Sequence, residues 1–293
     1  RLEGVGRGGV FAVRTPEDAI AIRSYIEKNG CKKAVVVGAG FIGLEMAENL
    51  LIQKVSVTLI DMENQIMPNI MDPEMAEFAA KHLVKKGVKV LLGTAVQSIE
   101  GGEKVSAVQT SAGQIPADLV ILCIGVRPAT AFLQDSGLEM FKGTIVVDEY
   151  QRTNWKDVYA AGDCAMVKNR VTGKPQWSAM GSTANITGRA LAKTMTGTET
   201  YYAGCLGTGV VKLAEDLNAG RTGLTEKQAK DAGFDPVTVV SVTDDKAHYY
   251  PDSDVFVTKL IADRKTERLL GIQVLGAGAV DKMTDIAAVG ISA

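Results

Sequence analysis

The stretch KAVVVGAGFIGLEMAENLLIQKVSVTLID, residues 33–61, decides how the first half of this chain folds. It begins with a run of β-formers, passes through a glycine motif at 38–43, continues as an apolar-periodic helix and ends in a second strand-like run at 55–61. Strand, glycine turn, helix and strand in this order predict a β-α-β unit. Such a unit is typical of proteins that hold a dinucleotide.

Each glycine of the motif permits something that a larger residue would hinder. Gly38 allows the tight turn from strand to helix, Gly40 lets the backbone approach a pyrophosphate, and Gly43 lets the helix pack closely on the strand. The phosphates would then meet the free N–H groups of the helix N-terminus. Asp61 lies eighteen residues beyond Gly43, at the end of the second strand. Its carboxylate can accept both ribose hydroxyls and would repel a 2′-phosphate, which favours NAD(H) over NADP(H).

Two other glycine-rich stretches fit the same motif only in part. Residues 4–9 follow no strand and precede no immediate helical pattern, so we interpret them as a loop. Residues 276–278 follow a strand-like run, but Asp281 takes the third glycine position and would crowd the contact between helix and strand. We interpret that stretch as an ordinary turn between a strand and a helix.

Length, charge and hydropathy exclude several classes of protein. The 293 residues suggest about two domains with a sizeable core. The chain has 34 Asp and Glu residues and 32 Lys and Arg residues, which gives a net charge of −2, and it has no blocks of like charge. We therefore expect no nucleic-acid partner. The longest apolar runs, such as residues 119–124, are far shorter than the ~20 residues that cross a bilayer, and we expect no membrane partner.

The four cysteines are widely separated and form no C-x-x-C pair: they are Cys31, Cys123, Cys164 and Cys205. With the two histidines, His82 and His248, they make no metal-ligand spacing, so we expect no metal site. A small buried hydrophobe is the favoured interpretation of each thiol. A reducing, cytoplasmic location is the simplest interpretation of the set.

The two ends of the chain indicate a piece of a longer protein. The first residue is Arg1, and residues 281–293 stop inside a pattern that predicts an amphipathic helix. An uncapped apolar helix face is an unusual place for a natural chain to end.

Apolar periodicity, together with the prolines and glycines that begin and end elements, predicts the remaining helices and strands. Proline and acidic residues begin a helix at Pro16–Asn29, and Pro73 begins one over 72–86 that ends before Gly87. The strands predicted before residue 125 are 88–92, 95–99, 105–110, 114–116 and 118–124. From Tyr201 on the pattern is strand-rich, with strands at 210–213, 221–224, 237–242, 255–262 and 269–274 and helices from Thr225 to about Gly233 and from Asp281 onward.

A second informative stretch is TNWKDVYAAGD, residues 153–163, in which a short strand ends in small residues and presents Asp163 on a glycine turn. An aspartate placed there can accept a hydroxyl group from an extended polyol. The alternative is an Asp that merely caps the next element of the chain.

Four motifs, taken in order, resemble those of the pyridine nucleotide-disulfide oxidoreductases: residues 38–43 with Glu45, GVRP at 125–128, AAGD at 160–163 and GSTAN at 181–185. The greatest similarity is to coenzyme A-disulfide reductases and NADH oxidases or peroxidases. The resemblance implies an α/β fold in which a Rossmann-like NAD-binding domain (31–142) is inserted in an FAD-binding domain (1–30 and 143–200). An α+β dimerisation domain, truncated here, would follow at 201–293.

The resemblance also implies the residues that bind NAD: Gly38, Gly40, Phe41, Ile42, Gly43, Asp61, Gly125 and Val126. Phe41 falls where the family commonly has a tyrosine that swings aside to let nicotinamide stack on the flavin. Glu45 matches the acid beside the nicotinamide carboxamide, although a solvated glutamate on a helix face is the alternative interpretation of it.

For FAD the resemblance implies contacts from Gly162, Asp163, Gly181, Ser182, Thr183 and Ala184. Asp163 matches the acid that binds the ribityl chain, and residues 181–185 match a helix N-terminus that faces the flavin pyrimidine. Hydride transfer to the flavin builds negative charge there, which a helix N-terminus stabilises by ~0.3–2 kcal/mol.

Tyr249 and Tyr250 fall in AHYYP, residues 247–251. In coenzyme A-disulfide reductases the matching stretch carries a tyrosine that reaches the partner subunit's active-site cysteine. One of the two would then donate a hydrogen bond to a thiolate or peroxide and, with Phe41 and Glu45, complete the implied catalytic set. The alternative is aromatic packing on an edge strand.

The chain departs from the family at the redox cysteine, which would precede Arg1 and is not among the four cysteines present. The implied function is that of a homodimeric flavoprotein that passes hydride from NADH to FAD and on to a cysteine centre. That centre would reduce a small-molecule disulfide such as coenzyme A disulfide, or a persulfide. Two alternatives stay open: an NADH oxidase or peroxidase that reduces oxygen or peroxide, and a truncated NAD-binding and dimerisation fragment without turnover.

Overall fold

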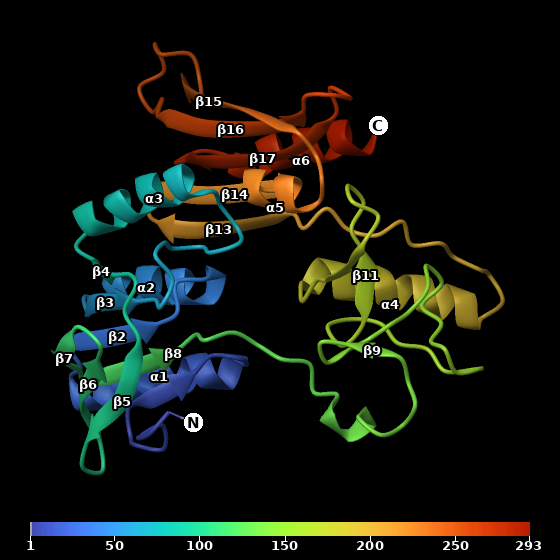
Figure 1. Ribbon diagram of the computed structural model, residues 1–293. Coiled ribbons are helices and arrows are strands. Elements are labelled where there is room, and N and C mark those ends of the chain that lie inside the picture. The colour runs from blue at the N-terminus through green and yellow to red at the C-terminus, as the bar shows by residue number, and fades with distance from the viewer. Residues whose placement is uncertain (1) are drawn as a thin grey trace.

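A computed structural model describes residues 2–293 and divides into three parts along the chain (Figure 1). We call them the N-terminal domain (2–122), the middle segment (123–208) and the C-terminal domain (209–293). The first holds a parallel sheet with helices, the second one long helix with short strands, and the third an antiparallel sheet. This is the predicted α/β fold, a Rossmann-like unit followed by an α+β domain.

The N-terminal domain is built on a five-stranded parallel sheet in the order β1-β8-β2-β3-β4. Its strands are Val10–Ala12, Leu119–Leu122, Lys33–Val37, Ser56–Ile60 and Lys89–Leu91 in that order. Three helices cover one face: α1 (Pro16–Asn29), α2 (Phe41–Ile52) and α3 (Pro73–Lys85). A three-stranded antiparallel sheet covers the other, with β5 at Val96–Gly101, β6 at Val105–Thr110 and β7 at Gly113–Pro116.

In the N-terminal domain, the strand β1 is the element that the sequence pattern did not predict. It has three residues, too few for a period to be recognised, and is held in place by pairing with β8, with Val10 opposite Val120. The sheet therefore reaches upstream of residue 31, where the predicted NAD-binding domain begins. Residues 4–9 before it form a loop, as predicted.

The middle segment contains α4 (Gly181–Met195) and two small antiparallel pairs. One pair is β9 (Met140–Phe141) with β10 (Thr144–Ile145), and the other is β11 (Met166–Lys168) with β12 (Pro175–Trp177). A 3₁₀ turn at Ala131–Leu133 lies on the connection from the N-terminal domain. Figure 1 shows this segment beside the stack formed by the other two parts.

The C-terminal domain is a five-stranded antiparallel sheet in the order β13-β14-β17-β16-β15. The strands are Gly209–Ala214, Leu217–Gly223, Leu269–Gly276, Val255–Asp263 and Pro236–Asp244 in that order. The short helix α5 (Glu226–Asp231) follows β14, and α6 (Val280–Ser292) packs on one face of the sheet. The predicted strand at 221–224 is thus the end of a longer one. The turn predicted at 276–278 is the connection 277–279 between β17 and α6.

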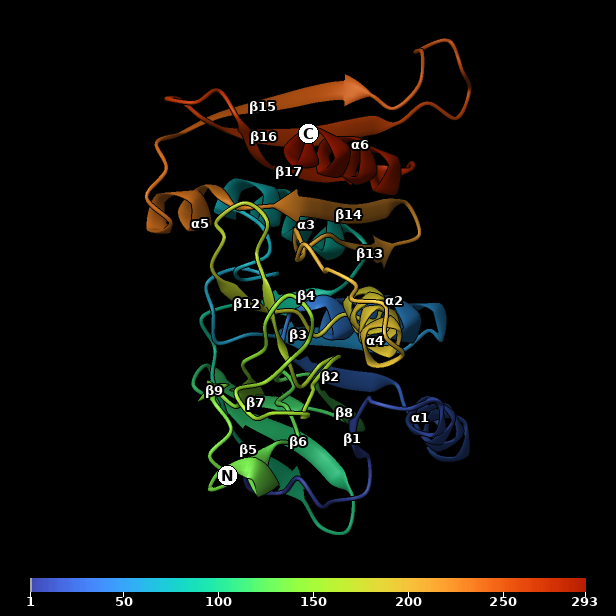
Figure 2. The same cartoon turned by 90° about the vertical axis from the view of Figure 1, so that its right-hand side faces the viewer.

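The N-terminal and C-terminal domains share one apolar core. The helices α2 and α3 lie between the parallel sheet and the antiparallel sheet, as Figure 2 also shows. From α2 and α3 come Leu44 and Leu83, and Leu213 and Leu275 of the C-terminal domain belong to the same buried cluster. Separating the domains would expose this apolar surface to water, at a free-energy cost of about 25 cal/mol per Å². The two sheets are therefore fixed relative to each other.

Candidate nucleotide-binding site

The glycine turn between β2 and α2 lies at the carboxyl end of the parallel sheet. Gly38 has φ of +104°, and a Cβ on it would lie 2.3 Å from the carbonyl oxygen of Cys123 at the end of β8. A Cβ on Gly43 would lie 1.8 Å from the carbonyl oxygen of Gly38. Both positions therefore require glycine for the backbone to approach so closely.

Gly40 has a different role, because no protein atom lies within 4 Å of a Cβ built on it. It is the N-cap of α2, and no side chain caps the helix there. The first-turn N–H groups of α2 thus have no side-chain acceptor, and the space beside Gly40 is open, which suits an anion such as a pyrophosphate. Ile42, on this first turn, is partly exposed.

Asp61 follows β3 and turns its carboxylate toward the glycine turn. Its Oδ2 accepts a hydrogen bond of 2.6 Å from the Ala39 N–H, and its Oδ1 accepts one of 2.9 Å from the Glu63 N–H. Each carboxylate oxygen has two lone pairs, so each keeps one acceptor position. Those positions can accept the hydroxyls of a ribose.

The open end between β2 and β8 is a topological switch point, because the chain leaves β2 toward β3 on one side while β8 lies on the other. Ligands of open α/β sheets bind at such points. Gly125, with φ of +91°, and Val126, 57 % exposed, follow β8 at this end. The structure therefore brings the motif at 38–43 beside residues 125–126, which lie far apart in sequence.

Phe41 and Glu45 lie on α2, one turn apart, in different surroundings. The Phe41 ring is half-buried against β13, where a Cβ on Gly209 would come within 3.1 Å of its Cζ. The Glu45 side chain is exposed and makes no ion pair within residues 2–293. The aromatic ring is thus packed where α2 meets the C-terminal domain, and the carboxylate faces solvent.

Cys123 lies beneath the glycine turn, a position that its sequence context did not indicate. Burial raises the pKa of this thiol to about 11. Burial also raises the pKa of Cys31. Both thiols are therefore protonated at neutral pH and act as small apolar groups.

The residues predicted to hold FAD converge on the N-terminus of α4. The Gly162 N–H donates a hydrogen bond of 3.3 Å to Thr187 Oγ1, which places the turn at 162–163 against this helix. The Asp163 side chain is exposed, and its carbonyl oxygen accepts a 2.8 Å bond from Trp177 Nε1. Trp177 was missed by sequence reasoning, because nothing in its neighbourhood marks it.

The first turn of α4 has the uncapped character seen at α2. Its N-cap is Met180, which offers no side-chain acceptor, and Gly181 and Ser182 are exposed. Thr183 is buried and bonds Ser178 at 2.9 Å, and Ala184 is half-buried. A hollow of about 340 Å³ opens beside this turn, lined by Ser182, Thr183 and Ile186 of α4 and by residues 202–208.

Tyr249 and Tyr250 lie on the loop between β15 and β16, at the far edge of the C-terminal domain (Figure 1). They are 75 % and 52 % exposed, and their rings stack with centroids 5.2 Å apart. Residues 247–251 form no strand, in contrast to the alternative prediction of an edge strand. No contact within residues 2–293 brings the two rings to the glycine turn, and both rings are exposed to solvent.

No helix within residues 2–293 is long and apolar enough to cross a membrane. Over the same residues, no group of three His, Cys, Asp and Glu side chains is placed to hold a metal ion. His82 instead pairs with Asp216, at 2.9 Å from Nε2 to Oδ1.

Comparisons with known proteins match this architecture. A family model described as pyridine nucleotide-disulphide oxidoreductase matches residues 1–188, and one for the dimerisation domain of that family matches 213–293. A relative named NAD(P)H sulfur oxidoreductase (CoA-dependent), from Pyrococcus abyssi, is 38% identical over 98% of this chain and 64% of its own length. A relative named NADH oxidase, from Methanocaldococcus jannaschii, is 37% identical over 99% of this chain and 64% of its own length.

A solved structure titled as a NAD-dependent persulfide reductase from A. fulgidus superposes with a TM-score of 0.95 at 36% identity, covering 99% of this chain and 54% of that one. The chain thus spans less than two thirds of the length of each of these three relatives. The family model covers well over half of the residues here. The chain therefore belongs to the pyridine nucleotide-disulphide oxidoreductases.

Proposed function

We propose that this chain is the NADH-binding and dimerisation part of a flavoprotein that passes hydride from NADH to FAD and on to a cysteine centre. That centre reduces a disulfide such as coenzyme A disulfide, or a persulfide. One observation carries the proposal: the uncapped N-terminus of α2 stands beside Asp61 at the open end of β2 and β8.

In this proposal the residues of the N-terminal domain bind and orient the nicotinamide nucleotide. The N–H groups of the first turn of α2 hold the pyrophosphate, and Asp61 accepts the ribose hydroxyls. The Phe41 ring limits access to the nicotinamide position, and Glu45 accepts from the carboxamide. Gly125 and Val126 supply the exposed turn along which the nicotinamide lies.

The residues around α4 fit the bound flavin in the same way. Asp163, whose carboxylate makes no hydrogen bond within residues 2–293, accepts from the ribityl chain. The N–H groups of residues 181–183, which have no acceptor within the helix, stabilise negative charge on the flavin pyrimidine. Bound FAD supplies the acceptor for hydride and the donor of the electrons that leave.

Names of relatives support two electron acceptors. The Pyrococcus relative named for CoA-dependent sulfur reduction and the A. fulgidus persulfide reductase favour a sulfur substrate. The NADH oxidase of Methanocaldococcus jannaschii, almost equally similar, favours oxygen or peroxide as the alternative. A fragment without turnover is the remaining alternative.

A homodimer and a cytoplasmic location complete the proposal. The dimerisation-domain match supports the first, as do the exposed valines of the edge strand β15, which include Val239 and Val242. All four cysteines are free thiols, which supports a reducing compartment. Tyr249 and Tyr250, exposed at the same edge, are placed to reach a partner subunit.

Turnover with different acceptors tests this function. The flavin-loaded, full-length enzyme is given NADH with coenzyme A disulfide under anaerobic conditions, or with oxygen alone. The proposal predicts NADH consumption and free coenzyme A thiol in the first assay. Consumption with oxygen alone would support the oxidase alternative, and no NADH consumption in either assay would contradict the proposal.

A further inference from the structure

The segment that joins β3 to α3, residues 62–72, links the glycine turn to the C-terminal domain. Three side chains of the segment itself are buried: those of Ile66, Met67 and Met71. Met67 and Asn69 have φ of +50° and +63°, a left-handed conformation that residues other than glycine seldom adopt. Such a conformation persists only where surrounding contacts hold it.

The N-terminal part of the segment is hydrogen-bonded to the centre of the glycine turn. The Met67 N–H donates a hydrogen bond of 2.8 Å to the Ala39 carbonyl oxygen. The Ala39 N–H in turn donates to Asp61, the residue just before the segment. Both backbone polar groups of Ala39, between Gly38 and Gly40, are therefore held by residues 61–67.

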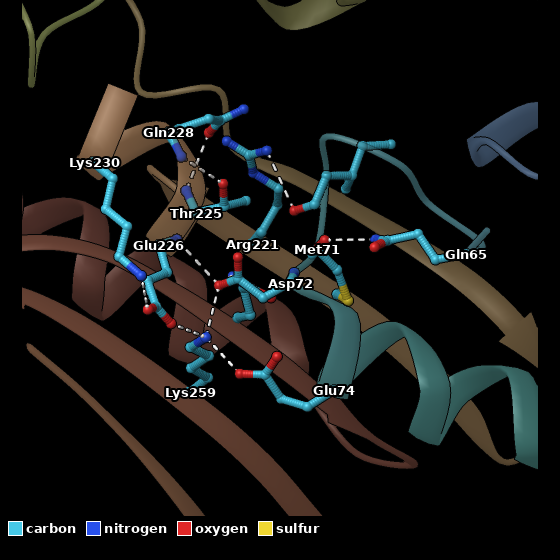
Figure 3. Close-up of polar contacts among 12 residues, drawn as sticks. Gln65, Met71, Asp72, Glu74, Arg221, Thr225, Glu226, Gln228, Lys230 and Lys259 are labelled. Carbon is cyan, nitrogen blue, oxygen red and sulfur yellow. Dashed lines mark hydrogen bonds and ion pairs between the residues drawn. The ribbon is translucent and has the colours of Figure 1, made fainter. Parts of the chain in front are cut away.

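At its second end the segment is held by side chains of the C-terminal domain (Figure 3). Arg221 of β14 donates through Nη1 to the carbonyl oxygens of Asn69 at 3.0 Å and Ile70 at 3.3 Å. Gln228 of α5 donates through Nε2 to the same Asn69 oxygen at 3.0 Å. These donors fix the left-handed turn from outside the domain that contains it.

Asp72, the last residue of the segment, is fixed more firmly still. Its N–H donates to Gln273 Oε1 at 2.8 Å, and its Oδ2 accepts from Gln273 Nε2 at 2.6 Å and from the Glu226 N–H at 3.1 Å. The same oxygen lies 3.0 Å from Nζ of Lys259, which is 1 % exposed. The start of α3 therefore cannot shift unless these contacts break.

Arg221 makes no ion pair within residues 2–293. Burial lowers the pKa of its guanidinium, because burial penalises the charged form. A charged group in such surroundings is costly unless its donors are satisfied. Three carbonyl oxygens satisfy it: those of Asn69, Ile70 and Gly223. Two of these three carbonyl oxygens belong to segment 62–72, and both accept from Nη1 of Arg221.

We propose that Arg221 and Gln228 are positioning residues for nucleotide binding, through which the C-terminal domain holds segment 62–72 against the glycine turn. The inference rests on the proposed binding of NADH at that turn. It makes the affinity for NADH depend on contacts in the domain expected to join the subunits. Because such coupling is reciprocal, bound NADH should slow amide exchange over residues 67–72.

Two variants of the flavin-loaded, full-length enzyme test the inference. Arg221→Met removes the donors and keeps an unbranched apolar chain. Gln228→Glu removes the Nε2 donor but keeps an oxygen that accepts from the Thr225 N–H, so the cap of α5 survives. If Arg221→Met does not fold, Gln228→Glu alone decides.

Both variants are expected to raise the Kd and KM for NADH about 2- to 30-fold, the range typical of couplings carried by packed networks, with kcat nearly unchanged. Arg221→Lys keeps a charged donor group at this position and should therefore recover part of the lost NADH affinity. The matched control is Lys227→Met on the same helix, whose Nζ pairs with Asp231 on the exposed surface. It should leave both constants unchanged.

Unchanged NADH affinity in folded Arg221→Met and Gln228→Glu, with weaker binding in Asp61→Ala, would overturn the inference and leave the proposed function standing. If Asp61→Ala also binds NADH as the wild type does, the assignment of this carboxylate fails, and with it the binding mode on which both proposals rest. Amide exchange at Met67 gives a second readout, since loss of the Arg221 and Gln228 contacts should speed that exchange in the absence of NADH.

Discussion

The Ala39 N–H donates a hydrogen bond of 2.6 Å to Oδ2 of Asp61, across the carboxyl ends of β2 and β3. This contact fixes the acid beside the glycine turn before any nucleotide arrives. A preorganised acceptor loses little entropy when a ligand binds. The same contact sets the orientation of the acceptor positions that remain on Asp61.

Asp61→Ala should weaken NADH binding about 10- to 100-fold, because a hydrogen bond to a charged group contributes ~1.5–3 kcal/mol. Asp61→Asn should weaken it less and narrow the preference for NADH over NADPH, since the repelling charge is gone. Fluorescence titration with both nucleotides measures the two effects. Equal NADH affinity in wild type and Asp61→Ala would contradict the assignment of this carboxylate.

Gly40 and Gly43 form a matched pair that separates binding from folding. Gly43→Ala places a methyl group 1.8 Å from the Gly38 carbonyl oxygen and should destabilise the fold by ~1–3 kcal/mol or more. Gly40→Ala meets no protein atom within 4 Å at a φ of −80°, so the fold should keep its stability while the methyl group obstructs the pyrophosphate. Urea unfolding and NADH titration of both variants check this. The reverse pattern would refute it.

Lys259→Met should lower the free energy of unfolding by ~3–5 kcal/mol, because three carboxylates lose their shared cation. Nζ of Lys259 lies 3.0, 2.5 and 2.8 Å from Asp72, Glu74 and Glu226 (Figure 3). Lys246→Met, which removes an exposed partner of Asp252, is the control and should change stability little. Urea unfolding at neutral pH makes the comparison, and similar losses in both variants would argue against the buried cluster.

The pKa of Lys259 bears on the pH at which this cluster acts. Burial lowers that pKa, but the hydrogen bonds that Lys259 donates to Glu226, Glu74 and Asp72 outweigh burial and raise the pKa above its ordinary value of 10.5. The contribution of the lysine to stability is therefore complete below pH 10.5 and is lost only as the pH rises beyond it. Between pH 6 and pH 9 the loss in Lys259→Met should be constant.

Asp216 should make stability depend on pH at the acid end. Partial burial raises its pKa, but hydrogen bonds from Lys86 and His82 outweigh that and bring it to about 2. A lowered pKa stabilises the fold above the ordinary value of 3.8, and this stabilisation fades as the pH falls toward 2. Urea midpoints of wild type and Asp216→Asn should therefore differ at pH 6 and converge toward pH 2. A constant difference over this range would show that ionisation of Asp216 plays no part.

Local signals explain which parts of the fold were predictable. The helix at Pro16–Asn29 has its predicted ends because Thr15 caps it, proline begins it and Gly30 closes it in the left-handed conformation. The β-α-β unit at 33–61 was predictable from other local signals, namely the spacing of its glycines and the apolar runs of its two strands. The strand β1 was not, since pairing with β8 defines it and no pattern within its three residues does.

The contacts around the site likewise fall into those that local sequence predicts and those that only tertiary structure reveals. The motifs at 38–43 and 160–163 mark turns whose residue types follow from backbone geometry. The ion cluster joins Asp72 to Lys259, far apart in sequence, and no local periodicity relates them. Arg221 and Trp177 likewise act through tertiary contacts alone, so only the folded chain reveals them.

Anaerobic mixing of the flavin-loaded, full-length enzyme with NADH tests the central claim most directly. The account predicts that one equivalent of NADH bleaches the visible absorption of the bound flavin. In Asp61→Ala the same bleaching should require a higher NADH concentration. Enzyme that carries stoichiometric FAD and keeps its visible absorption in excess NADH would contradict the account.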